Sequence, residues 1–264
     1  MRILVTNDDG INAPGLAVLA DIARALSTDV WVVAPETNQS GTSHSLTLHT
    51  PLRVREISER TFAIGGTPTD CVIMAVRHIL KDERPTLILS GVNDGSNVAE
   101  DVTYSGTVAG AMEGTILGIP SMALSLMTRS LTAHPVAHWD TPRTHAPDLI
   151  RRLLAAGLPA GTLVNINFPA LPPSEVCGVM VTRQGIREQE SLIVDQRADP
   201  WGRPYYWFGF RHLPSTLVEG TDLFALASGA ISVTPLSLDL TNDAVTARLR
   251  VGLEDGSWGQ AVKG

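Results

Sequence analysis

The sequence predicts an α/β fold with a mostly parallel sheet and flanking helices. An apolar, β-branched run at Ile3–Thr6 ends in the turn-prone residues Asn7–Gly10, as a strand that enters a loop does. After Pro14, apolar residues recur at helical spacing, and a second apolar strand follows at Val30–Ala34. Strand, helix and strand within about 35 residues form the βαβ unit of a parallel sheet.

The same alternation continues to residue 168. We expect helices at about 69–80, 106–117 and 145–156, and strands at 86–90, 121–125 and 163–168. The strand at 163–168 is expected to complete the main sheet, and 91–105 and 133–142 are expected to be loops. Residues 47–64 alternate between apolar and polar, which indicates an antiparallel excursion with strands at 52–55 and 61–64.

The composition changes beyond Pro169. The pair Pro172-Pro173, the aromatic stretch Tyr205–Phe208 and scattered glycines indicate long hairpins rather than further βαβ units. We therefore expect residues 1–264 to form a single α/β domain, with a core at 1–169 and a hairpin-rich extension at 170–264. The extension is expected to cover the site or to reach a partner subunit.

Composition excludes several classes of protein. The chain is 44% hydrophobic and 18% charged, which is typical of a folded domain, and its apolar runs are too short to cross a membrane. The formal net charge of −7 argues against binding of long nucleic acids, which requires a basic surface. Two cysteines without metal-ligand spacing favour neither disulfides nor zinc. These features indicate a cytoplasmic enzyme.

Polar clusters follow three of the predicted strands. They are Asp8-Asp9, Asn38-Gln39-Ser40-Gly41 and the segment Ser90–Asn97. Ligands of parallel sheets bind beyond the carboxyl ends of the strands, so these loops are expected to converge. Carboxylate, hydroxyl and amide oxygens suit Mg²⁺ or Mn²⁺ rather than zinc. Each cluster taken singly also has a simpler interpretation as a turn or a helix cap.

A candidate anion site precedes the predicted helix at 106–117. The turn Ser105-Gly106-Thr107 offers hydroxyl groups, backbone N–H groups and the positive end of the helix dipole, although simple N-capping by Ser105 or Thr107 is the alternative. For the similar segment Gly65–Asp70 we favour capping by Thr69 or Asp70 over a phosphate or ribose contact. His44 is interpreted as a surface histidine, with proton donation as the alternative. Trp201, Tyr206 and Trp207 are interpreted as sealing a hairpin or an interface, with base stacking as the alternative.

Together these segments resemble the survival protein SurE family of 5′/3′-nucleotidases. The matching segments are residues 3–10, 13–15, 33–35, 39–41, 66–72, 90–97, 101–108, 221–222 and 231–236. They span nearly the whole chain in the expected order, which is far more specific than any one motif. The resemblance is weakest at 129–143 and 185–215.

The resemblance implies a Rossmann-like core and one divalent cation, Mg²⁺ or Mn²⁺, held by Asp8, Asp9, Ser40 and Asn93. It also implies hydrolysis of nucleoside 5′-monophosphates, with 3′-monophosphates and short polyphosphate as further substrates. Assembly as a homodimer or homotetramer through exchanged C-terminal segments is expected as well. The hypothesis for the reaction is attack by a metal-activated water, with the phosphate held by Ser105, Gly106, Thr107 and Asn97. Asp8 or Asp9 then steers the water or accepts its proton.

Alternatives come both from other classes of protein and from other enzymes. Receiver domains of signalling proteins also carry an acidic pair after the first strand. They also need a phospho-accepting Asp after a middle strand, where this chain has Asn93-Asp94, and a lysine after a later strand, and no suitable lysine follows here. Haloacid-dehalogenase phosphatases use an Asp-x-Asp spacing, which Asn7-Asp8-Asp9-Gly10 lacks. A nucleotide-binding module without catalysis is the remaining alternative, and an exopolyphosphatase is the alternative within the enzymes.

Overall fold

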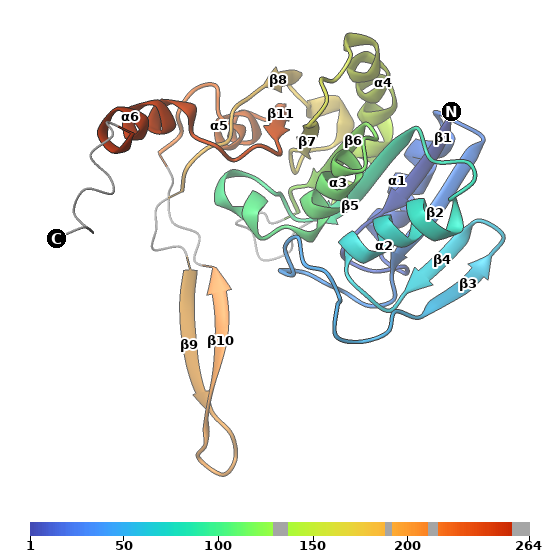
Figure 1. Ribbon diagram of the computed structural model, residues 1–264, viewed down its shortest axis with the longest axis horizontal. Coiled ribbons are helices and arrows are strands. Elements are labelled where there is room, and N and C mark those ends of the chain that lie inside the picture. The colour runs from blue at the N-terminus through green and yellow to red at the C-terminus, as the bar shows by residue number, and fades with distance from the viewer. Residues whose placement is uncertain (129–136, 188–191, 211–215, 255–264) are drawn as a thin grey trace, which may run out of the picture.

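The computed structural model describes residues 1–128, 137–187, 192–210 and 216–254. Over these residues the chain forms a nine-stranded sheet in the order β3-β4-β2-β1-β5-β6-β7-β11-β8, and β9 and β10 form a separate hairpin (Figure 1). The strands are β1 (Arg2–Thr6), β2 (Asp29–Pro35), β3 (Val54–Ser58), β4 (Thr61–Ile64), β5 (Leu87–Asp94), β6 (Ser121–Leu126), β7 (Thr162–Phe168), β8 (Val179–Val181), β9 (Leu192–Ala198), β10 (Pro204–Phe210) and β11 (Ile231–Ser237).

The sheet is mostly parallel, as the sequence predicts. Strands β4, β2, β1, β5, β6 and β7 run parallel to one another, whereas β3 pairs antiparallel with β4, and β11 pairs antiparallel with β7. The central register places Thr6 beside Ser90, so β1 and β5 end at the same edge. The loops after these strands therefore share one side of the molecule.

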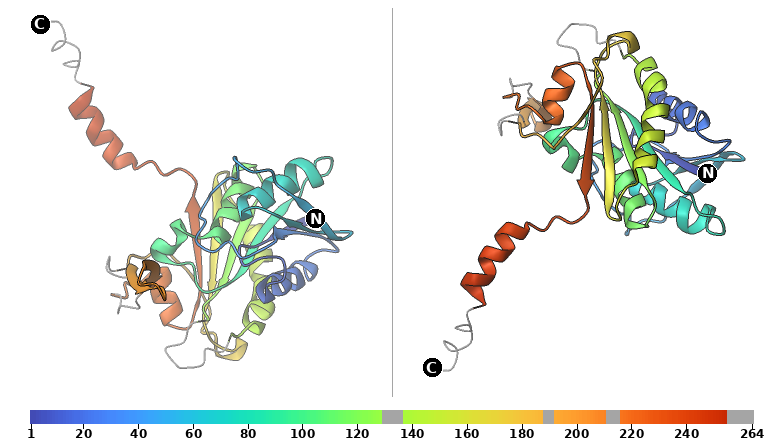
Figure 2. Two further views of the ribbon diagram at one scale, coloured as in Figure 1. Left: turned by 90° about the horizontal axis from the view of Figure 1, so that it is seen from below. Right: turned by 90° about the horizontal axis from the view of Figure 1, so that it is seen from above.

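Helices cover both faces of the sheet, as Figure 2 shows. They are α1 (Pro14–Arg24), α2 (Pro68–Met74), α3 (Gly106–Ile116), α4 (Asp140–Ala156), α5 (Asp222–Ala227) and α6 (Asp243–Leu253), with short 3-10 turns at Ala99–Thr103 and Pro173–Glu175. Helices α1 and α4 pack on one face, and α2 and α3 on the other.

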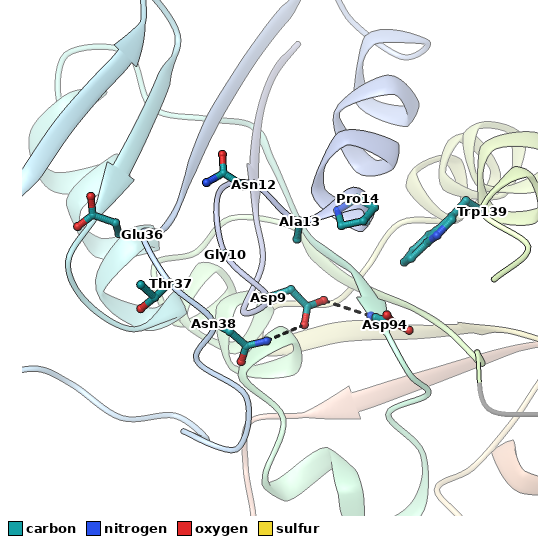
Figure 3. Close-up of a pocket in the computed structure, with 11 residues that line it drawn as sticks. Asp9, Gly10, Asn12, Ala13, Pro14, Glu36, Thr37, Asn38, Asp94 and Trp139 are labelled. Atoms are coloured by element: carbon teal, nitrogen blue, oxygen red, sulfur yellow. Dashed lines mark hydrogen bonds between the residues drawn. The ribbon is translucent and has the colours of Figure 1, made fainter. Parts of the chain in front are cut away.

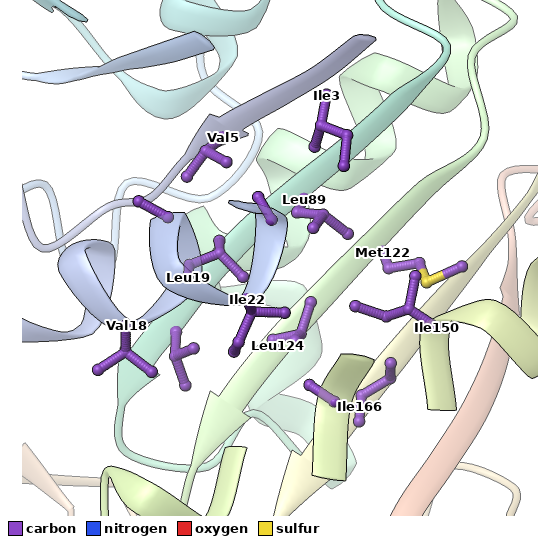
Figure 4. Close-up of a cluster of buried hydrophobic side chains, with 14 of the residues drawn as sticks. Ile3, Val5, Val18, Leu19, Ile22, Leu89, Met122, Leu124, Ile150 and Ile166 are labelled. Carbon is purple, nitrogen blue, oxygen red and sulfur yellow. The ribbon is translucent and has the colours of Figure 1, made fainter. Parts of the chain in front are cut away.

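Alternating side chains of the buried strands supply both cores. Ile3 and Val5 of β1 pack toward Leu19 and Ile22 of α1 in the larger cluster (Figure 4), whereas Leu4 packs on the α2 side. The side chains of Ile3, Leu4 and Val5 are completely buried. Because successive strand residues point to opposite faces, one apolar run serves two helical layers.

Several expected boundaries are wrong. Strand β5 continues past Ser90 to Asp94, so residues 91–94 are not loop; an irregularity in the β5–β6 pairing at Gly91, with φ of +131°, allows it. Helix α2 ends at Met74 and continues as a π-helical turn to Ile79, and α4 begins at Asp140, within the segment expected to be loop. Residues 129–136 of that segment lie outside the described residues. The strand expected at 52–55 lies at 54–58.

The sheet does not end at β7. Strand β11 joins it antiparallel, and β8 pairs with β11, so the strand at 163–168 does not complete the sheet as expected. Sequence order conceals this addition because about 60 residues, including the β9–β10 hairpin, separate β7 from β11. The expected hairpin is present, and it projects from the body of the molecule, as does α6 (Figures 1 and 2).

Candidate functional site

Three loops meet at Asp8 and Asp9, directly after β1. The backbone N–H of Gln39, in the loop after β2, donates to the backbone oxygen of Asp8 at 2.7 Å. The Asn38 side chain reaches Oδ1 of Asp9 at 3.5 Å, and the backbone N–H of Asp94, at the end of β5, donates to Oδ2 at 3.2 Å. Figure 3 shows Asn38 and Asp94 on opposite sides of the Asp9 carboxylate. The expected convergence of these loops is confirmed.

Asp8 also contacts the turn that opens α3. The Thr107 hydroxyl donates a hydrogen bond to Oδ1 of Asp8. Gly106 approaches so closely that a Cβ atom there would lie 2.8 Å from Cβ of Asp8. Ser105 is the N-cap of α3, and its Oγ accepts from the N–H of Val108 at 3.0 Å. The capping interpretation of Ser105 is therefore confirmed, and the capped helix end faces the carboxylate pair.

Burial disfavours the charged form of both carboxylates. Desolvation raises the pKa of Asp8, and the hydrogen bond from Thr107 opposes this only in part. The pKa of Asp9 is raised to about 6, first by burial and then by the neighbouring charge of Asp8. Within the described residues, neither carboxylate pairs with a lysine, arginine or histidine. Two adjacent carboxylates in this setting favour a bound cation.

The loops that meet at the pair carry further oxygen donors of the kind that a hard divalent cation prefers. The amide nitrogen of Asn93 donates to the backbone oxygen of Gly95 at 2.8 Å, which leaves its Oδ1 as the acceptor atom of that side chain. Ser40 is exposed in the loop after β2, and its N–H donates to Oδ1 of Asn38 at 2.8 Å. In the described part of the chain, no three His, Cys, Asp or Glu side chains gather as a metal site. Two carboxylates with neutral oxygens fit magnesium or manganese better than zinc.

Asn97 is fixed in place by polar groups from two buried strands. Its side-chain Nδ2 donates to Oγ of Ser125 at 2.8 Å, and its backbone N–H donates to Oδ1 of Asn167 at 2.8 Å. Its carbonyl oxygen accepts from Nδ2 of Asn165 at 2.8 Å and from Nδ2 of Asn167 at 3.1 Å. All four residues are buried. Asn97 therefore has little freedom to move.

Sequence reasoning missed Ser125, Asn165 and Asn167. The sequence could have indicated the two asparagines, because they interrupt an otherwise apolar run. The structure shows that this strand, Thr162–Phe168, is buried almost throughout. A buried polar side chain costs free energy unless it is hydrogen-bonded, so two of them in one buried strand indicate a polar partner.

Two further predictions concern residues beside the site. His44 is exposed, as expected of a surface histidine, and its imidazole lies 3.0 Å from Oε2 of Glu113 on α3. The segment Gly65–Asp70 caps a helix, as favoured, but the cap is Thr67: its hydroxyl accepts from Asp70 N–H, and Asp70 accepts from Thr67 N–H.

The aromatic residues of the extension lie on the β9–β10 hairpin. Trp201 is 80% exposed and Trp207 58% exposed, and the ring of Trp207 packs edge-on against that of Tyr205. These rings do not form part of the carboxylate cluster.

A candidate cation site beside a helix N-terminus, at the carboxyl edge of a Rossmann-like sheet, defines a class of protein that acts on phosphate groups. Among the described residues, no helix has the length and apolar character needed to cross a membrane. The family model "Survival protein SurE" matches residues 3–191, and this chain belongs to that family.

Individual relatives agree with the family match. The 5′-nucleotidase SurE of Rhodopseudomonas palustris (strain BisB5) is 60% identical over 251 residues, which cover 94% of this chain and 98% of the relative. The protein of the same name from Bradyrhizobium diazoefficiens is 57% identical over 256 residues, which cover 96% of this chain and 100% of the relative. The crystal structure of the SurE protein from Aquifex aeolicus has a TM-score of 0.82 at 42% identity, over 97% of this chain and 100% of that one.

Proposed function

We propose that this protein is a divalent-metal-dependent nucleotidase that hydrolyses nucleoside 5′-monophosphates to nucleoside and phosphate. The hydrogen bond between Thr107 and Asp8 carries the proposal, because it joins the candidate cation site to the helix end that suits an anion. The names of relatives 60% identical to this chain supply the substrate class. Membership of this family implies a divalent cation as the cofactor but does not specify which metal.

We assign the cation to Asp8, Asp9, Ser40 and Asn93, and Mg²⁺ or Mn²⁺ suits these oxygen donors. When bound, such an ion neutralises phosphate oxygens and lowers the pKa of a water molecule. The raised pKa values of the carboxylates support the assignment, since a cation would relieve the cost of keeping both charged.

The phosphate is assigned to the turn Ser105-Gly106-Thr107 and to Asn97. The first-turn N–H groups of α3 have no carbonyl partner within the helix and suit phosphate oxygens. Gly106 keeps this turn open beside Asp8 because it carries no side chain. Asn97 is held by Ser125, so its position is set before substrate arrives, as transition-state stabilisation requires. Asp8 or Asp9 steers the attacking water or accepts the proton that the water loses.

The test is phosphate release from a panel of nucleoside 5′- and 3′-monophosphates, with Mn²⁺, with Mg²⁺ and with chelator. We expect metal-dependent release that is lost in Asp8→Ala. Asp148→Ala is the matched control, because Asp148 is an exposed residue of α4 that pairs with Arg152. Equal release with and without chelator contradicts the role of the cation. Absence of release from the whole panel, under every metal, contradicts the nucleotidase.

We further propose that the protein is a cytoplasmic homo-oligomer, a dimer or tetramer, in which the extension at 170–264 reaches a second copy. Helix α6 has no buried residue, and Leu249 and Val251 are 51% and 82% exposed. Exposed apolar side chains on projecting elements are typical of association surfaces. Both cysteines are free, which fits a reducing compartment. Light scattering of the full chain tests the assembly, and a monomer at micromolar concentration contradicts it.

A further inference from the structure

A pocket of about 510 Å³ opens beside Asp9, on the side of the sheet edge where α1 begins. Its walls come from the turn after β1, the start of α1, the loop after β2, the end of β5 and the start of α4. In Figure 3, Glu36 and Thr37 lie at one end, Trp139 lies at the other, and Asp9 lies between them. This volume is within the range of small-molecule sites, and the α3 turn assigned to phosphate does not line the pocket.

Trp139 is a rigid wall of this pocket. It directly precedes α4, it is partly buried, and it packs against the main apolar core. Its ring lies so close to α1 that a Cβ atom on Gly15 would be 3.2 Å from the indole Cη2. A ring held from behind loses little freedom when a flat ligand packs on it, which favours stacking.

The negative charge of the pocket favours a neutral part of the substrate over a phosphate group. Among the residues that the structure describes, the lining carries the carboxylates of Asp9, Glu36 and Asp94 and no lysine, arginine or histidine. Arg55 pairs with Glu36 at 3.0 Å but does not line the pocket. A second phosphate group would meet negative charge here, whereas a ribose and a base are neutral. Asn12 and Asn38 offer amide groups to such a neutral, polar ligand.

We infer that this pocket is the nucleoside subsite, in which the nucleobase stacks on the indole of Trp139. The inference rests on the proposed function and adds the residue that recognises the base. The nucleotide then spans Asp9, with its phosphate at the α3 turn and its base at Trp139. Base–aromatic stacking tolerates any base, so Trp139 raises the affinity for nucleotides over sugar phosphates without selecting one base.

The test compares adenosine 5′-monophosphate with ribose 5-phosphate, which lacks the base, on Trp139→Leu and Trp139→Phe. We expect Trp139→Leu to lower kcat/KM for the nucleotide about 10-fold, mainly through KM, and to leave ribose 5-phosphate unchanged. Trp139→Phe keeps an aromatic face and most of the activity. An equal loss on both substrates, or no loss on the nucleotide, overturns the inference.

A second variant guards against misfolding of Trp139→Leu. Ala13 also lines the pocket and has an extended backbone, φ −69° and ψ 140°, so Ala13→Leu narrows the pocket without changing the ring. The same selective loss on the nucleotide is expected. Calorimetry with adenosine, which has no phosphate, separates the two proposals. If adenosine binds in a way that depends on Trp139 while adenosine 5′-monophosphate is not hydrolysed, the nucleotidase alone is overturned. Hydrolysis of the nucleotide that is indifferent to both variants overturns the nucleoside subsite alone.

Discussion

The Thr107 hydroxyl donates a hydrogen bond to Oδ1 of Asp8, across 99 positions of sequence. Asp8 follows β1 and Thr107 lies in the first turn of α3, so this bond fixes the candidate cation site against the candidate phosphate site. It also lowers the pKa of a carboxyl group whose burial raises it. The bond therefore favours the charged form of Asp8, which is the form that binds a cation.

The first prediction is that Thr107→Val weakens the metal affinity about 10-fold or more. A hydrogen bond to a charged group contributes roughly 1.5–3 kcal/mol, and its loss leaves Asp8 more easily protonated. The measurement is phosphate release as a function of Mn²⁺ concentration. Thr107→Ser keeps the hydroxyl and serves as the control. Equal metal dependence of Thr107→Val and Thr107→Ser would show that this bond has no part in cation binding.

The second prediction concerns the close approach of α3 to Asp8. In Gly106→Ala the added Cβ would lie 2.8 Å from Cβ of Asp8, so the carboxylate or the helix must shift. A displacement of this size near reacting groups lowers kcat/KM about 10- to 100-fold.

Gly110→Ala is the matched control, one turn further along α3. There the methyl group would meet Ser90 Oγ at 2.8 Å and Thr6 Cγ2 at 3.1 Å, and the three atoms nearest to it belong to Ser90 and Thr6 rather than to Asp8. Both variants are expected to lower the melting temperature, but only Gly106→Ala is expected to lower the activity of the folded enzyme beyond that. Similar kinetics for the two folded variants would remove Gly106 from the site.

Local pattern was sufficient for the parallel core and for the carboxylate pair. The apolar runs that form β1, β2 and β7 are long enough to predict strands, and their loops fall on one edge because parallel strands share direction. The position of β11 was not predictable in this way. Its partner β7 is distant in sequence, and strand pairing over such a separation depends on tertiary packing rather than on local propensity.

The same distinction applies within the site. Asp8 and Ser105 are marked by their motifs, whereas Ser125 and Trp139 are ordinary residues of a strand and a helix start in the sequence. Only the fold brings Oγ of Ser125 to 2.8 Å from Asn97 and places Trp139 in the pocket beside Asp9. Residues of this second kind belong to no sequence motif, so they can be identified only from the three-dimensional arrangement of the strands.

The third prediction is that Ser125→Ala lowers kcat about 10-fold without changing the metal affinity. The change removes the partner of Asn97 Nδ2 in a buried setting, which costs about 1–3 kcal/mol and frees the amide to turn. Ser121→Ala is the control, since Ser121 is also buried in β6 and its hydroxyl donates to the backbone oxygen of Ile119. If the metal affinity falls together with kcat, the role of Ser125 is to support the cation site rather than to position Asn97.

The fourth prediction follows from the pKa of Asp9, which is raised from 3.8 to about 6. Between these values the folded, metal-free protein binds more protons at Asp9 than the unfolded chain does. Its free energy of unfolding therefore falls as pH rises from about 4 to about 6. Asp9→Asn removes this contribution, so in chelator at pH 8 the variant is expected to be more stable than the parent protein.

The expected gain of Asp9→Asn is about 1–2 kcal/mol, which is less than the full shift implies because Asp9 is partly exposed to solvent. At pH 4 the difference is expected to vanish, because the parent Asp9 is then protonated when folded. Saturating Mn²⁺ reverses the order at pH 8, since a ligand that binds only the folded state stabilises it and the parent binds the ion more tightly. Urea titrations at the two pH values, with chelator and with Mn²⁺, measure all three differences. A parent protein that is the more stable one in chelator at pH 8 would mean that Asp9 already has a charge partner in the folded protein, and the argument for a cation at this carboxylate would lose its basis.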